Sequence, residues 1–153
     1  MISDQSKNNA MKMILASHGS LAEGLLSAVR MIAGDEGNIE AFGLDTYETP
    51  AAIVQIVADR IAARPPGEHL VILCDIKGGS VYNELLPLCA ADDVSLISGM
   101  NLGLALGLAL ASPHDPVRET QQNAIDMAKQ YIEYYDKDVL AELKKQEEED
   151  ELW

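Results

Sequence analysis

Apolar and polar residues follow two different patterns along this chain. Nearly unbroken apolar runs at residues 11–17, 69–74 and 94–97, and a shorter mixed run within 38–44, predict four strands. Strands that are apolar throughout are buried on both faces, as in a parallel sheet. Between and after them, apolar residues recur at helical spacing, which predicts helices at 21–33, 50–63, 81–89, from 102 to before Pro113, and 117–130.

This alternation of strands and helices predicts a three-layer α/β fold with a mainly parallel, doubly wound sheet. Right-handed crossovers restrict the topology, and a small sheet of this kind usually has the strand order 2-1-3-4. In that order the first and third strands are neighbours, and the chain leaves them in opposite directions. The crevice above their carboxyl ends is where such folds bind ligands.

Two helix starts have recognisable capping residues. Ser20 is expected to cap the first helix, and Glu23 three residues later completes a capping box. Ser80 is expected to cap the helix that follows the third strand.

Polar residues gather where the strands end. His18 follows the first strand and Asp75 the third, while Ser98 and Asn101 follow the fourth. A carboxylate that accepts a hydrogen bond from one imidazole nitrogen leaves the other nitrogen free as a nucleophile. Glycines allow a loop to approach an anion closely with its N–H groups, and the loop after Asp75 contains Gly78, Gly79 and Ser80. Each of these residues alone is equally consistent with a turn or a cap.

Composition narrows the classes of function. The 153 residues carry a formal net charge of −14 without a cluster of Lys and Arg, which argues against binding of nucleic acid. No apolar run is long enough to span a bilayer, which takes about 20 residues, and no signal peptide is evident, so we expect a cytoplasmic protein. Cys74 and Cys89 are expected to be reduced thiols. We expect neither a metal nor another cofactor, and no chemical role for His69 or His114.

The ends of the chain differ from its centre. Residues 1–10 are polar and predict a disordered extension, residues 11–135 the domain, and residues 136–153 an acidic tail or helix. Residues 131–135 are rich in strand formers, yet apolar residues from Ile125 to Leu143 also fit one long helix. The pattern alone leaves both alternatives open.

The motifs at three strand ends occur together in one known family. The segments 13–24, 31–34, 75–83 and 98–102 resemble the enzyme IIA component of the mannose family of the bacterial phosphotransferase system (PTS). The resemblance covers roughly residues 12–135 and implies a mannose-type PTS IIA domain. Its function would be to carry a phosphoryl group during coupled sugar uptake and phosphorylation.

The resemblance also implies roles for individual residues. His18 would accept the phosphoryl group from phospho-HPr and pass it to a separate IIB protein, with the membrane components IIC and IID involved only indirectly. Asp75 would orient His18. The family forms homodimers, and residues 131–135 fall where some members exchange an added antiparallel strand. The remaining residues that would shape the site are Ser17, Gly19, Ser20, Gly78, Gly79, Ser80, Ser98 and Asn101.

The chain departs from the family pattern at Lys77, Val81 and Gly103, which affects the loop shapes and the partner preference. Three alternatives remain open. The chain could be the phosphoryl-donor subunit of a PTS-dependent dihydroxyacetone kinase, a regulatory module that uses phosphohistidine as a signal, or a small hydrolase that uses His18 and Asp75. The sequence does not name the sugar, because the membrane components and the IIB partner select it.

Overall fold

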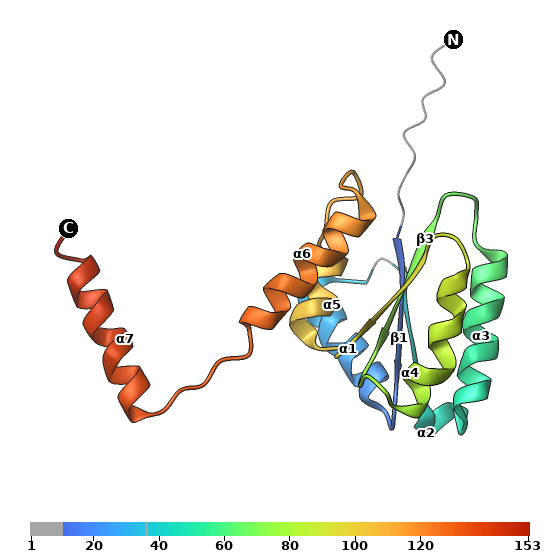
Figure 1. Ribbon diagram of the computed structural model, residues 1–153, viewed down its shortest axis with the longest axis horizontal. Helices are drawn as coiled ribbons and strands as arrows, with labels where there is room; N and C mark the ends of the chain where they lie inside the picture. Colours follow the sequence, from blue (N-terminus) through green and yellow to red (C-terminus); the bar gives the residue numbers. More distant parts are fainter. Residues whose placement is uncertain (1–10, 36) are drawn as a thin grey trace, which may run out of the picture.

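The computed structural model describes residues 11–35 and 37–153, so the predicted extension at 1–10 lies outside the described residues. Its centre is a four-stranded sheet in which every neighbouring pair is parallel (Figure 1). The strand order β2-β1-β3-β4 confirms the prediction. The strands are β1 (Met11–Ser17), β2 (Ile39–Gly43), β3 (His69–Cys74) and β4 (Val94–Ser98).

Helices cover both faces of the sheet (Figure 1). On one face lie α1 and α5, with α6 packed against α5, and on the other lie α3 and α4. The predicted three-layer architecture is therefore confirmed. The helices are α1 (Leu21–Ala33), α2 (Leu44–Tyr47), α3 (Pro50–Ala63), α4 (Ser80–Leu85), α5 (Leu102–Ala109), α6 (Val117–Gln130) and α7 (Lys137–Asp150), with a 3₁₀ helix, η1 (Leu86–Ala90), after α4.

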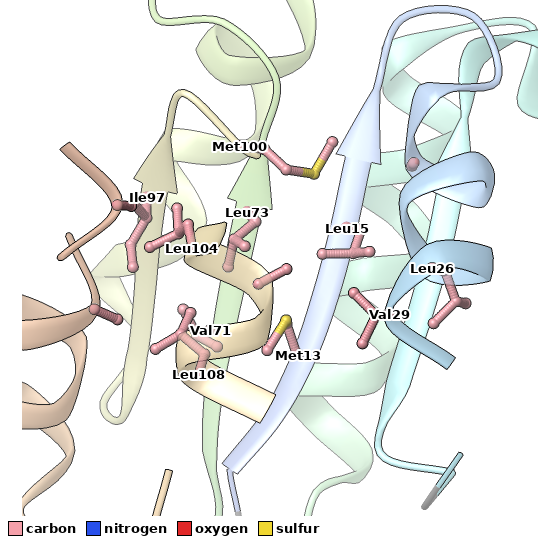
Figure 2. Packing of buried hydrophobic residues seen from close by; sticks show 14 residues of the cluster. Met13, Leu15, Leu26, Val29, Val71, Leu73, Ile97, Met100, Leu104 and Leu108 are labelled. Atoms are coloured by element: carbon pink, nitrogen blue, oxygen red, sulfur yellow. The ribbon is translucent and has the colours of Figure 1, made fainter. Parts of the chain in front are cut away.

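Alternate residues of the central strands pack into two separate apolar layers, because successive side chains of a strand point to opposite faces. Leu15 and Leu73 belong to the layer under α1 and α5, shown in Figure 2, and both are fully buried. Ile14 and Ile72 belong to the layer under α3 and α4. These two layers hold the carboxyl ends of β1 and β3 side by side.

The start of α1 differs from the prediction. Ser20 occupies the N-cap position but forms no side-chain capping bond. Instead, the backbone N–H of Ala22 donates to Oγ of the buried Ser17, 2.7 Å away, and the Glu23 carboxylate accepts a hydrogen bond from Gly43. The predicted capping box is therefore wrong, because Ser17 accepts the free N–H of the helix and the Glu23 carboxylate is bonded to β2.

The segment after β3 also differs. Gly79, not Ser80, is the N-cap of α4, and the α-helix ends at Leu85 before a 3₁₀ turn. Pro87 explains the early end, because it lacks the N–H that an α-helix would require for a bond four residues back. Residues 44–47, directly after β2, form the short helix α2, which the sequence pattern did not predict.

Neither alternative for residues 131–135 is found. Tyr131 ends α6 in a turn, residues 132–136 are in neither helix nor strand, and α7 follows, so no fifth strand joins the sheet within the described residues. In Figure 1 this segment leads away from the sheet, and α7 stands apart from the other helices. The described part of α7 contains no buried residue.

Two expectations from composition can be compared with the structure. Both cysteines are free thiols, and burial raises the pKa of the Cys74 thiol to about 11 and raises that of Cys89 as well. Among residues 11–35 and 37–153, no helix has the length and apolar character needed to cross a membrane.

The two serines at the start of α1 should differ in their effect on stability. Ser17→Ala removes the acceptor for the Ala22 N–H and is expected to lower the free energy of unfolding by about 1 kcal/mol. Ser20→Ala removes no capping bond and should change it by less than about 0.5 kcal/mol. Urea denaturation of both variants measures the difference, and an equal loss in the two would contradict the assignment.

Candidate phosphoryl-transfer site

His18 donates two hydrogen bonds, one from its backbone and one from its ring, to a single carboxylate oxygen of Asp75. Oδ2 of Asp75 lies 2.8 Å from the His18 backbone N and 2.8 Å from Nδ1 of the ring. Because the carboxylate can only accept, Nδ1 carries the proton and Nε2 of the neutral ring presents a lone pair. The His18 side chain is 47% exposed and that of Asp75 only 10%, so the nucleophilic nitrogen faces solvent while its partner is covered.

Asp75 is held in its charged form. Burial alone would raise the pKa of this carboxyl, but hydrogen bonds from the His18 backbone and ring, together with one from the Ile76 N–H, outweigh it and lower the pKa. A carboxylate that stays ionised fixes the imidazole tautomer. It also stabilises the positive charge that develops on the ring when Nε2 attacks an electrophile.

The loop after β3 completes the surroundings of the ring. Oγ of Ser80 lies 3.3 Å from Nε2 of His18, within reach for its hydroxyl to donate. Gly79 packs against the ring so closely that a Cβ at this position would lie 3.1 Å from Cε1 of His18 and 2.9 Å from a methyl carbon of Ile76. Any larger residue would push the ring or the loop aside.

The other predicted residues border this centre. Gly19 and Gly78 adopt positive φ angles of 52° and 80° in the two turns beside His18. Ser98 ends β4, and the loop after it is tied to β3 by a bond from Met100 N to Cys74 O of 3.0 Å. Within the described residues, Oδ1 of Asn101 accepts from Leu104 N at 2.9 Å, so Asn101 caps α5 and has no hydrogen bond with His18.

Two of the residues that depart from the family pattern have a clear role in packing. Val81 is a buried core residue of α4. Gly103 lies directly under the ring of Tyr131, and a Cβ there would overlap that ring. The small residue therefore lets the end of α6 pack on the start of α5, at the same edge of the sheet as His18. Lys77 is exposed.

Sequence reasoning missed Gly43 beside the site and gave Glu23 a different role, as part of a capping box. The N–H of Gly43, the last residue of β2, donates to Oε1 of Glu23 at 2.7 Å. The strand order was the signal that could have identified them, because it places the end of the second strand next to the turn containing His18.

At the opposite edge of the sheet, Nε2 of His69 lies 2.9 Å from Oγ of Ser95, and burial lowers the pKa of His69.

Comparisons with known proteins identify the family of the chain. The sequence model of the family "PTS system fructose IIA component" (EIIA-man) matches residues 12–125. No curated protein sequence matches the chain. Among solved structures, a Klebsiella pneumoniae protein assigned as a phosphoenolpyruvate-dependent sugar PTS permease is 30% identical with a TM-score of 0.76, covering 87% of this chain and 96% of its own.

Two further structures have the same fold. The mannose/sorbose-specific PTS IIA subunit of Enterococcus faecalis is 26% identical with a TM-score of 0.64, covering 83% of this chain and 96% of its own. The PTS component EIIA of Streptococcus agalactiae is 20% identical with a TM-score of 0.72, covering 81% and 96% respectively. Because the family model covers most of the chain, the protein belongs to the mannose family of PTS IIA components, whose members transfer phosphoryl groups for sugar uptake.

The link between Asp75 and His18 should make stability depend on pH. A pKa lower in the folded than in the unfolded chain stabilises the fold above the ordinary aspartate pKa of about 3.9, and this contribution is lost as the pH falls through the lowered value. Asp75→Asn removes this contribution. Unfolding free energies measured below about pH 5 should therefore fall more steeply for the wild type than for the variant, whereas parallel curves would contradict the assignment.

Proposed function

We propose that this protein is a phosphocarrier that accepts a phosphoryl group from phospho-HPr on Nε2 of His18 and passes it to a separate IIB protein. The observation that carries the proposal is the hydrogen bond from Nδ1 to Asp75, which leaves the exposed Nε2 as the only ring nitrogen with a free lone pair. The same proposal places the protein in the cytoplasm, where it would meet HPr and IIB.

The transfer needs only groups at this site and the donor. The Nε2 lone pair forms a bond to phosphorus while the bond from phosphorus to HPr breaks, and the donor keeps the electron pair of that bond. The ring becomes positively charged, and ionised Asp75 stabilises it through the Nδ1–H bond. The Ser80 hydroxyl, beside Nε2, would donate to a phosphoryl oxygen. Transfer to IIB is the same reaction in the opposite direction.

We also propose that the protein is a homodimer in which residues 131–135 pair with the partner's sheet. Among the described residues β4 pairs only with β3, so its outer edge is free. A cavity of about 530 Å³ runs along that edge between β4 and α6. Four large side chains of this segment, Tyr131, Ile132, Tyr134 and Tyr135, are each more than half exposed. Exposed apolar side chains that lie together in this way mark interaction surfaces.

His18 is expected to be the only acceptor of phosphate. Wild-type protein incubated with labelled phospho-HPr should gain one acid-labile phosphoryl group, and His18→Ala should lose at least about a hundredfold of this labelling. His114→Ala, with its ring in an exposed turn, is the matched control and should label normally. If His18→Ala still takes up acid-labile phosphate, the proposal is wrong.

The fate of the labelled phosphate distinguishes the alternatives. A chase onto a mannose-type IIB protein supports the sugar system, and a chase onto a dihydroxyacetone kinase supports the kinase-donor alternative. Retention on the protein with either acceptor favours a regulatory module, and phosphate release without any acceptor favours a hydrolase.

The dimer proposal is tested by the size of the protein in solution, measured by size-exclusion chromatography. The full chain is expected to elute as a dimer, whereas chains that end at Gln130 should elute as monomers because they lack the pairing segment. A chain that ends at Asp136 is the control and should remain a dimer without α7. Dimers formed by the chain ending at Gln130 would contradict the pairing.

A further inference from the structure

The carboxylate of Glu23 lies between the end of β2 and the turn that contains His18. Its Oε1 accepts the Gly43 N–H at 2.7 Å. Its Oε2 is buried and has no hydrogen-bond partner among the described residues. Gly43 is in register with Ser17, the residue before His18, so this carboxylate connects the first turn of α1 to the strand beside the phosphoryl acceptor.

Gly43 makes this arrangement possible because it has no side chain. A Cβ at this position would overlap the carbonyl oxygen of Gly19 and Oε2 of Glu23, and would lie 2.9 Å from Oε1. The Gly19 carbonyl and the Glu23 carboxylate therefore both contact the backbone of β2 at one point. The Asp45 N–H adds a second connection to the same turn by donating to the Gly19 carbonyl at 3.3 Å.

We infer that Glu23 is a positioning residue for phosphoryl transfer, which fixes the turn 18–20 from the β2 side. The inference rests on the proposed role of His18. Asp75 holds the turn from the β3 side only, and Gly19 lies in the turn with a positive φ angle of 52°. A hydrogen bond from a backbone N–H to a carboxylate is among the stronger hydrogen bonds that can fix a turn.

The unpaired oxygen supports a functional role. A buried polar atom without a partner costs free energy, and such groups are few in native proteins. Native proteins depart from such local rules mainly at functional sites.

The test compares substitutions at Glu23 with one remote control. Glu23→Ala removes the bond to Gly43 and is expected to slow phosphoryl transfer from phospho-HPr roughly tenfold or more through kcat, because small misplacements of a reacting group have large effects on rate. Glu23→Gln keeps an acceptor for Gly43 and should stay within about twofold of the wild type. Arg64→Ala removes hydrogen bonds to the carbonyl oxygens of Glu68 and Asp93 at the opposite edge of the sheet and should not slow transfer.

Hydrogen exchange gives a readout that does not depend on phosphate. The Gly43 amide should exchange slowly in the wild type and in Glu23→Gln, and much faster in Glu23→Ala. If Glu23→Ala does not fold, Glu23→Asp carries the same expectations, because its carboxylate is one methylene too short to reach Gly43.

Three outcomes would overturn the inference. They are normal transfer by folded Glu23→Ala or Glu23→Asp, an equal loss in Glu23→Gln, and an equal loss in Arg64→Ala, which would indicate a general effect of stability. Wild-type protein that is not phosphorylated on His18 would overturn the proposed function instead, and the exchange of Gly43 would still report whether Glu23 holds the turn.

Discussion

The double hydrogen bond from His18 to one oxygen of Asp75 is the contact on which the rest of the site depends. It fixes the backbone at the end of β1, the tautomer of the ring and the direction of Nε2 with a single carboxylate. It exists because β1 and β3 are neighbours in a parallel sheet, so that their carboxyl ends meet. The two apolar layers on either side of the sheet keep these strands in register.

The turn that carries His18 is held from both neighbouring strands. On the β3 side, Asp75 holds the histidine directly, and Gly79 fits tightly against the ring. On the β2 side, Gly43 and Glu23 meet the carbonyl of Gly19. A nucleophile on a rigid scaffold loses little freedom when its partner docks, and proximity of this kind contributes to rate without any further chemical group.

The strand order and the meeting of His18 with Asp75 were predictable, because both follow from the alternation of elements and the rules of parallel sheets. The hydrogen-bond partners at the helix starts were not. Whether Ser17 or Ser20 accepts the free N–H groups of α1 depends on the exact geometry of the helix start, which a sequence pattern does not contain. The early end of α4 was readable in principle, since Pro87 signals it. The path of residues 131–136 depends on tertiary contacts, which the spacing of apolar residues does not reveal.

The distribution of the site along the chain has a consequence for biosynthesis and quality control. His18 and Asp75 are separated by 57 residues, and His18 and Ser80 by 62. Contacts at such separations form late, because the closure of long loops must precede them. A nascent or misfolded chain therefore contains the histidine but not its carboxylate partner in place. Competence to carry a phosphoryl group would mark a chain whose β1 and β3 have already paired.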